Sequence, residues 1–355
     1  MPGKAPRFAK HRGAQPSKPP REHFSDVIYI PYLDNLEISQ HCKNAVFVSV
    51  YAALRCFGVY SDLYSCTAEF EELKEYNNKI YHLLNDDFLL SDVADKIYNC
   101  GDFLGFALNG ADGYSLVTAN FCRQKLCPMC QKRKSLKAYA NTLKVYEYLQ
   151  RYNVEYIHLV LTVPNCSGGV DLVNTVKRLY KSFGKFYNYK DCKAAFKGCL
   201  RCLEISYNYE NGTFHPHLHC LICVNASYFS SRYYLSYDRL RDLWAKANNT
   251  DEAYQISVGK IKGDVKLGFA EICKYCFKPL DFSLIDDTTA KYILETMGIV
   301  LKGQRCVQKY GLIKEAFHHL NIDNIEDDTE EIKQMFDTPK YFRYNKIKRE
   351  YRGLN

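Results

Sequence analysis

Two histidines and a glutamate stand out as possible metal ligands in this 355-residue chain. His217 and His219 open a strongly apolar run, and residues two apart in a strand lie on the same face of a sheet. Glu204 lies in an earlier strand-like segment, and Asn211-Gly212 between the two segments is a strong hairpin signal. If that dipeptide forms the turn, Glu204 lies opposite His219. One carboxylate and two imidazoles then converge on one point, which predicts a divalent metal site.

A His-x-His pair alone is more often a surface or core pair than a pair of ligands, so the hairpin partner is what favours metal binding. His215 shares the same face, but its position nearest the turn suits a supporting or surface role. Two nitrogens and one oxygen leave coordination positions open for water and phosphate, as catalytic sites do. Mixed imidazole and carboxylate ligation suits Mn²⁺ or Mg²⁺ as well as zinc, so this ligand set does not fix the metal.

A possible nucleophile lies in residues 270–279, a segment with no glycine or proline before Pro279 that is predicted to be helical. Glu271 and Tyr275 are four residues apart, on one face of that helix. With 30 tyrosines in the chain, an ordinary amphipathic side chain is the default for any one of them. A tyrosine hydroxyl, with a pKa of about 10, attacks phosphate poorly unless cations stabilise the phenolate. Lys274, Lys278 and the metal ion would supply those cations.

Three cysteines, Cys122, Cys127 and Cys130, have the spacing of a zinc knuckle. Cys100 is the best fourth ligand, because a hairpin-like stretch over residues 103–118 would return the chain to Cys122. Four thiolates would make a closed, structural zinc site; the alternative is a set of scattered free cysteines. Basic residues around this cluster could bind DNA phosphates, and these are Arg123, Lys125, Lys132, Arg133 and Lys134.

A second zinc site built from Cys220-x2-Cys223 and Cys273-x2-Cys276 is disfavoured. An odd offset in a strand places Cys220 and Cys223 on opposite faces, whereas a zinc knuckle needs a turn. The other pair lies in the predicted helix and has no knuckle glycine.

Together these motifs give the chain a family resemblance. In order and spacing they resemble the plasmid rolling-circle replication initiators of the HUH endonuclease superfamily, over about Cys100 to Leu320. Residues 121–130 look like the cysteine cluster that precedes the catalytic core in one branch of those initiators. No single motif would suffice, but four occur in the family order: Leu161–Asn165, Leu203–Ile205, His215–His219 and Glu271–Tyr275.

The resemblance implies an enzyme that nicks one strand at a double-strand origin, stays linked to the 5' phosphate and leaves a 3' hydroxyl for a polymerase. Tyr275 matches the nucleophile, and His217 and His219 match the metal ligands. Glu271 matches a carboxylate that serves as general base for water when replication ends. Glu204 as third ligand follows from the hairpin geometry rather than from the family.

The resemblance also sets the partners and the alternatives. Origin DNA, single-stranded or cruciform at the nick site, is the expected substrate, and a homo-oligomer stays open. The sequence has no Gly-x4-Gly-Lys-Ser/Thr motif, so a host helicase is expected to unwind DNA for the host polymerase. An HUH transposase of the two-tyrosine type would have a second tyrosine in place of Glu271. A non-enzymatic zinc-module DNA-binding protein would leave the histidine pair unexplained.

Charge is concentrated at the two ends of the chain, whose net charge is +8. Residues 1–23 and 339–355 each carry six Lys or Arg against one acidic residue, so the rest is close to neutral. DNA contact is therefore expected from local patches and from the two tails. Sixteen cysteines without a signal peptide favour a reducing cytoplasm, and the longest apolar run, residues 45–54, is too short to cross a membrane.

The expected fold class is α+β, with a central antiparallel HUH-like sheet and packed helices, a small cysteine zinc module and helical flanks. Helices are predicted over 131–152, 170–190 and 236–247, a buried strand over 156–163 and the hairpin over 199–207 and 214–224. The expected domains are a disordered basic tail (1–23), a mainly helical region (24–99), the zinc module with its connecting helix (100–152), the nuclease domain (153–284) and a C-terminal helical region with a basic tail (285–355).

Overall fold

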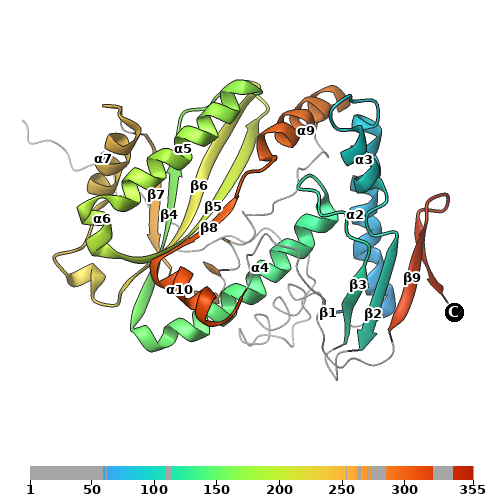
Figure 1. The fold of residues 1–355 in the computed structure, drawn as a ribbon, viewed down its shortest axis with the longest axis horizontal. Coiled ribbons are helices and arrows are strands. Elements are labelled where there is room, and N and C mark those ends of the chain that lie inside the picture. Colours follow the sequence, from blue (N-terminus) through green and yellow to red (C-terminus); the bar gives the residue numbers. More distant parts are fainter. Residues whose placement is uncertain are drawn as a thin grey trace, which may run out of the picture. The chain divides into compact units, whose positions relative to one another are not determined.

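The strands of the chain form two antiparallel sheets in the part that the structure describes. This computed structural model describes residues 59–60, 62–108, 113–252, 254–261, 265–266, 268–269, 272, 285–322 and 339–354. Within them, one five-stranded sheet has the order β7-β4-β6-β5-β8 and the other the order β1-β3-β2-β9-β10. We call the first the central sheet and the second the terminal sheet. The α+β class is confirmed, but the expectation of one sheet was incomplete (Figure 1).

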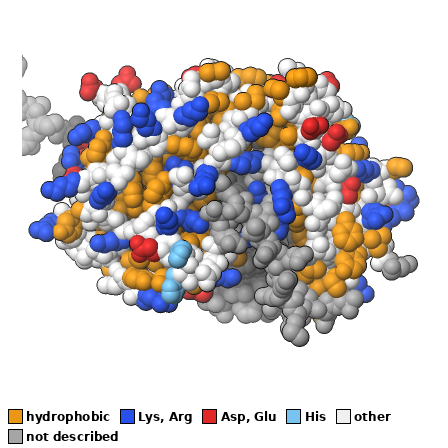
Figure 2. All heavy atoms as spheres, viewed as in Figure 1, with side chains coloured by type: hydrophobic (Ala, Val, Ile, Leu, Met, Phe, Trp, Pro, Cys, Tyr) orange, Lys and Arg blue, Asp and Glu red, His pale blue; other side chains and the backbone are white. Residues whose placement is uncertain are grey.

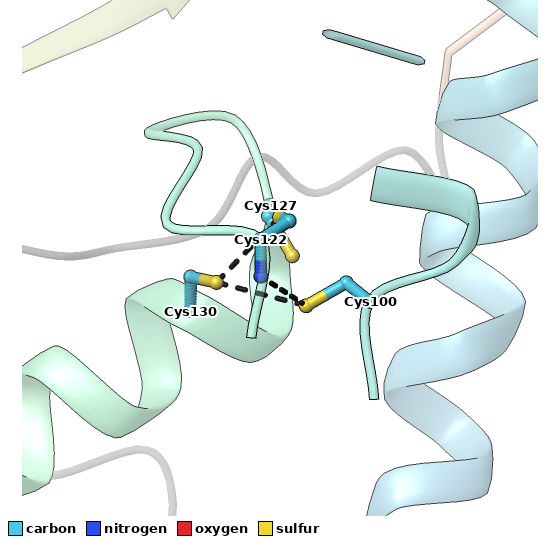
Figure 3. A group of neighbouring side chains, drawn as sticks. All are labelled: Cys100, Cys122, Cys127 and Cys130. Carbon is cyan, nitrogen blue, oxygen red and sulfur yellow. Dashed lines mark hydrogen bonds between the residues drawn. The ribbon is translucent and has the colours of Figure 1, made fainter. Parts of the chain in front are cut away.

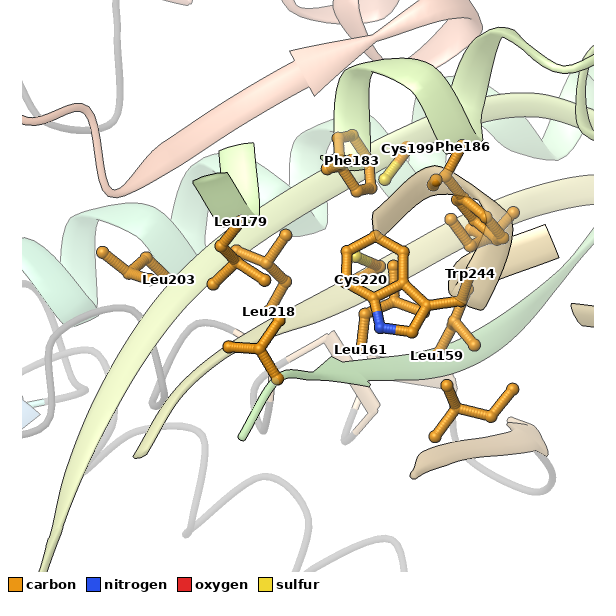
Figure 4. Packing of buried hydrophobic residues seen from close by; sticks show 14 of the residues in the cluster. Leu159, Leu161, Leu179, Phe183, Phe186, Cys199, Leu203, Leu218, Cys220 and Trp244 are labelled. Atoms are coloured by element: carbon orange, nitrogen blue, oxygen red, sulfur yellow. The ribbon is translucent and has the colours of Figure 1, made fainter. Parts of the chain in front are cut away.

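The central sheet contains the predicted hairpin and the predicted buried strand. It is buried on both faces because its two longest strands alternate apolar side chains toward each side. One face packs on helices α5 (Val170–Asn188) and α7 (Tyr237–Asn248). There the ring of Trp244 meets Phe186 edge to face at 5.8 Å, above Leu159 and Leu161 (Figure 4). The strands are β4 (Val154–Thr162), β5 (Phe196–Asn208), β6 (Thr213–Asn225), β7 (Ile256–Lys260) and β8 (Val307–Tyr310).

The opposite face of the central sheet packs on α4 (Pro128–Leu149) and α10 (Gly311–His319). Leu221 and Cys223 of β6 lie on this face, as do Leu200 and Cys202 of β5. By strand alternation the side chains of His217, His219 and Glu204 point the same way. A short helix, α6 (Lys190–Ala195), leads into β5.

The terminal sheet joins the two ends of the described chain. Its β2 pairs with the predicted hairpin partner β3 on one side and with β9 on the other. The C-terminal region is thus not uniformly helical, and its basic residues do not form a free tail. Hydrogen bonding along β2 fixes the C-terminal hairpin instead. The strands are β1 (Val59–Tyr60), β2 (Phe103–Leu108), β3 (Tyr114–Ala119), β9 (Lys340–Asn345) and β10 (Glu350–Leu354).

Helices α2 (Leu63–Leu84) and α3 (Ser91–Tyr98) pack on one face of the terminal sheet. Phe70 of α2 contacts Phe106 of β2 edge to face at 5.8 Å. Within the expected mainly helical region 24–99, residues 63–84 and 91–98 form helices, whereas residues 24–58 and the 1–23 tail lie outside the described residues.

Two helices contribute to the cores of both sheets. Helix α9 (Asp287–Leu301) contributes Leu294 to the terminal core and Ile293 to the central core. Helix α4 begins in the terminal core with Cys130 and ends against the central sheet with Leu149. No helix in the described ranges is both long and apolar enough to cross a membrane.

Candidate metal centres

Glu204, His217 and His219 converge on the α4-facing side of the central sheet. Oε2 of Glu204 lies 3.0 Å from Nε2 of His217 and 2.8 Å from Nε2 of His219. All three side chains are largely buried, and their possible ligand atoms lie within 4.8 Å of one another. One carboxylate oxygen and two imidazole nitrogens that face a common point are a donor set that can hold a divalent cation.

The strand register that produces this convergence differs from the predicted one. Glu204 pairs with His217, not with His219, because the loop has four residues rather than two. The Asn208 side chain accepts a hydrogen bond from the Glu210 N–H at 2.9 Å, which starts the turn before Asn211. The shift is by two residues, an even number, so each side chain keeps its face.

Backbone and side-chain hydrogen bonds fix which nitrogen each histidine presents. Nδ1 of His217 lies 3.1 Å from the carbonyl oxygen of His215, which can only accept, so Nδ1 donates there, and Nε2, which faces Oε2 of Glu204, is the nitrogen that a metal ion would take. Nδ1 of His219 lies 3.1 Å from Nε2 of His158, a residue of β4. Metal binding through Nε2 of His219 requires that Nδ1–H donate to His158. Sequence inspection missed His158, because its partner lies 61 residues away.

The electrostatics of this group favour an ionised carboxylate and a neutral outer imidazole. Burial alone would raise the pKa of Glu204, but hydrogen bonds from His217 and His219 outweigh it and hold that pKa well below its usual range. Burial, and then the charge of His219, lower the pKa of His158 to about 4. At neutral pH His158 is therefore uncharged and can accept the His219 proton.

The four cysteines of the predicted zinc module also come together. Cys100 follows α3, Cys122 follows β3, and Cys127 and Cys130 lie at the start of α4 (Figure 3). The Sγ of Cys130 lies 3.7 Å from the Sγ of Cys100 and 3.7 Å from that of Cys122. A tetrahedron with zinc–sulfur bonds of about 2.3 Å has edges of about 3.8 Å. These two distances fit zinc ligands, and all four sulfurs lie within 4.8 Å of one another.

Backbone donors and a buried lysine support this cysteine cluster. The N–H of Cys122 donates to Sγ of Cys100 at 3.3 Å, and the N–H of Arg123 donates to Sγ of Cys130 at 3.2 Å. Lys74 of α2 donates to the carbonyl oxygen of Cys100 at 3.2 Å, to that of Tyr98 at 2.7 Å and to Asp102 at 2.5 Å. The turn that carries the first cysteine is thus tied to α2.

The basic residues around the cysteine cluster differ in their exposure. Arg123 is exposed to solvent. Lys125 instead donates to the carbonyl oxygen of Gln304, and Arg133 lies over the ring of Phe121 at 4.7 Å. Of these three, Arg123 is placed best for contact with a DNA phosphate.

Within the segment predicted to carry the nucleophile, residues 270–279, the structure describes only Ile272, so Tyr275, Glu271, Lys274 and Lys278 are not placed. Ile272, which is described, is buried in the cluster that packs on the α4-facing side of the central sheet.

The disfavoured second zinc site is tested in part. Cys220 and Cys223 lie in the cores on opposite faces of the sheet, while Cys273 and Cys276 lie outside the described residues.

Comparison with known proteins decides the family. The model of the Replication protein family matches residues 113–352, which include both candidate metal-binding groups except Cys100 and extend into the C-terminal hairpin. The chain belongs to this family. The match continues beyond the segment that carries the motif resemblance, so the two strands at the C-terminus are part of the family's common region.

Individual family members are similar over most of their length. A "Protein rep" from Bacillus sp is 32% identical over 255 residues, covering 66% of this chain and 82% of that protein. A "Protein rep" from Staphylococcus aureus is 32% identical over 212 residues, covering 59% and 92%. One from Streptococcus pneumoniae is 29% identical over 242 residues, covering 66% and 74%. No solved structure matches.

Proposed function

We propose that this replication protein initiates rolling-circle replication of a plasmid by nicking one strand of the origin, as HUH endonucleases do. The observation that carries the proposal is the convergence of Glu204, His217 and His219 on one face of the central sheet. A zinc-module DNA-binding protein without enzymatic activity would have no use for this second donor group.

In this proposal the three side chains hold Mn²⁺ or Mg²⁺, which would polarise the scissile phosphate and stabilise negative charge on its oxygens. Tyr275 attacks the phosphorus through its hydroxyl oxygen. The bond to the 3' oxygen breaks, the strand's 5' phosphate stays on Tyr275 and the 3' hydroxyl leaves with a proton. Lys274 and Lys278 would favour the phenolate. The burial of Ile272 beside the metal-binding face supports placing this segment there.

Glu271 is proposed to activate water at termination. A carboxylate that positions water releases the enzyme by hydrolysis, whereas a second tyrosine would leave it covalently bound. We further propose that the four cysteines bind a structural zinc ion, because the sulfur–sulfur distances match a tetrahedral site.

The deciding experiment incubates the full chain with supercoiled origin DNA and Mn²⁺ and looks for a protein-linked nicked strand. Tyr275→Phe should abolish the adduct and keep origin binding within a few fold, because only the attacking oxygen is lost. Nicking by Tyr275→Phe would remove that residue from the mechanism.

A second comparison separates the roles of the two carboxylates. Glu271→Gln should still form the first adduct and then accumulate it on substrates with a second cleavage site. Glu204→Gln should weaken both Mn²⁺ binding and the first nick. A first-step defect with weakened metal binding at Glu271, and none at Glu204, would reverse these assignments.

A further inference from the structure

The face of the terminal sheet opposite α2 carries aromatic and basic side chains on adjacent strands. Strand pairing places Arg352, Arg343 and Phe103 in one row across β10, β9 and β2. The next row on the same face is Leu354 and Tyr341, followed by Gly105. We call these six residues the outer face. Figure 2 shows hydrophobic side chains beside Lys and Arg side chains over this end of the molecule.

The aromatic part of the outer face is a stacked pair. The rings of Phe103 and Tyr341 lie 5.4 Å apart and are inclined by only 20°. Tyr341 is 38% exposed, so part of its side chain is accessible to a ligand. A Cβ on Gly105 would come within 3.0 Å of the Tyr341 ring. The absence of a side chain there lets the ring lie flat across β2.

The basic part of the outer face is a pair of like charges. Arg343 and Arg352 are direct partners across β9 and β10, and both are exposed. Like charges directly opposite in a sheet destabilise it, so folding alone does not account for this pair. Glu350 shares the face and binds Nε of Arg352 at 2.8 Å, which offsets only part of the charge. Lys348 adds further positive charge in the hairpin turn, whereas Arg349 pairs with Glu75 of α2 at 3.1 Å.

We propose that the outer face binds single-stranded DNA, with bases stacked on Tyr341 and Phe103 and phosphates on Arg343 and Arg352. This deepens the proposed function and rests on it, because a nicking initiator exposes a single strand beside itself. Open aromatic faces beside a basic groove or ridge are the usual platform for unpaired strands, since any base offers a stacking surface. In a duplex the base faces are already stacked on each other, so the platform discriminates against it.

The test measures binding of the full chain to a labelled oligothymidylate by fluorescence anisotropy, without added Mn²⁺ or Mg²⁺. Tyr341→Ala should weaken binding about tenfold, within the range for loss of one stacked base, and Tyr341→Phe should retain it. Arg343→Ala should weaken binding and lower its salt dependence. The control is Tyr237→Ala on α7, since Tyr237 is similarly exposed, at 42%, and also lies near an arginine.

Unchanged affinity in both Tyr341→Ala and Arg343→Ala would overturn the proposal. So would equal competition by duplex DNA, or tighter binding of an oligouridylate, which would assign the face to RNA. Thermal melting of each variant shows whether weaker binding comes from the lost side chain or from unfolding. If Tyr341→Ala unfolds, Arg343→Ala still tests the proposal, because Arg343 is exposed. Repeating the measurement in Tyr275→Phe makes it independent of nicking. A failure of the outer face to bind single-stranded DNA can then be distinguished from a failure of the proposed nicking reaction.

Discussion

At the scale of single residues, the position of one proton decides whether His219 can bind a metal ion. His158 lies 3.1 Å from Nδ1 of His219 and, when neutral, can accept that proton. Groups that orient a metal-ligating histidine in this way change metal affinity without touching the metal. His158 is thus a positioning residue for the site.

His158→Phe should therefore weaken Mn²⁺ binding by about 10- to 100-fold, because it keeps a ring but removes the acceptor. Calorimetric titration with Mn²⁺ measures this directly. His158→Gln, whose side-chain oxygen can accept the same proton, is the matched variant and should lose less. Equal loss in both variants would mean that packing, not proton acceptance, is what His158 supplies.

The depressed pKa of His158 also predicts how the metal-free protein responds to acid. Its folded pKa of about 4 lies below the unfolded value of about 6.5, so the unfolded state takes up the proton first. The contribution of neutral His158 to the free energy of unfolding is present above pH 6.5 and is lost as the pH falls toward 4. The loss is on the order of 3 kcal/mol. Urea unfolding across this window should show a flatter pH dependence in His158→Phe than in the parent chain.

At the scale of elements, Lys74 links helix α2 to the turn that carries Cys100. Its ammonium is fully buried and bound by two carbonyl oxygens and Asp102, and burial lowers its pKa. Removing Lys74 leaves the two carbonyl oxygens without this donor, whereas Asp102 keeps its 3.1 Å pair with Lys346. Loss of Lys74 should therefore affect both the packing of α2 in the terminal core and the position of the turn that carries Cys100.

Lys74→Met should destabilise the protein by about 3–5 kcal/mol, measured by chemical unfolding. It should also speed the loss of zinc to a chelator, because the Cys100 turn is no longer held. Lys79→Met on the same helix is the control. Lys79 forms a 3.5 Å pair with Asp287 at the surface, and its loss should change stability by less than about 1 kcal/mol. Similar losses in both variants would show that Lys74 has no special role.

At the scale of the whole molecule, α4 joins the cysteine cluster to the central sheet. Its first turn carries Cys130, and its last turn packs on the face that holds His217 and His219. A structural zinc ion contributes its binding free energy to folding, so zinc bound as proposed at one end of α4 would stabilise an element that both cores share.

The paired variant Cys127→Ser, Cys130→Ser should lose zinc, lower the melting temperature and reduce nicking, because α4 is no longer anchored. The paired variant His217→Ala, His219→Ala should lose metal-dependent nicking and keep its zinc. Zinc content by atomic absorption, read beside thermal melting, distinguishes the two. Loss of zinc in the histidine variant would mean that one site had been mistaken for two.

The sequence by itself determined the features that depend on local spacing. Alternation put His217 and His219 on one face, and the cysteine spacing brought Cys122 and Cys130 together. The helices predicted over 131–152, 170–190 and 236–247, the buried strand and the hairpin have described counterparts, because their periodicity and turn signals are local in the sequence.

Only the tertiary structure decided what depends on distant partners. The hairpin turn begins at Asn208 rather than at the Asn-Gly dipeptide. Because the register shifts by two residues, an even number, Glu204 and the two histidines still lie on the same face of the sheet. His158 joined His219 because β4 pairs with β6 across a connection of about 50 residues, and no local pattern encodes that pairing. The C-terminal basic segment became two strands because β2 had an edge to which it could hydrogen-bond, a contact between residues more than 200 apart.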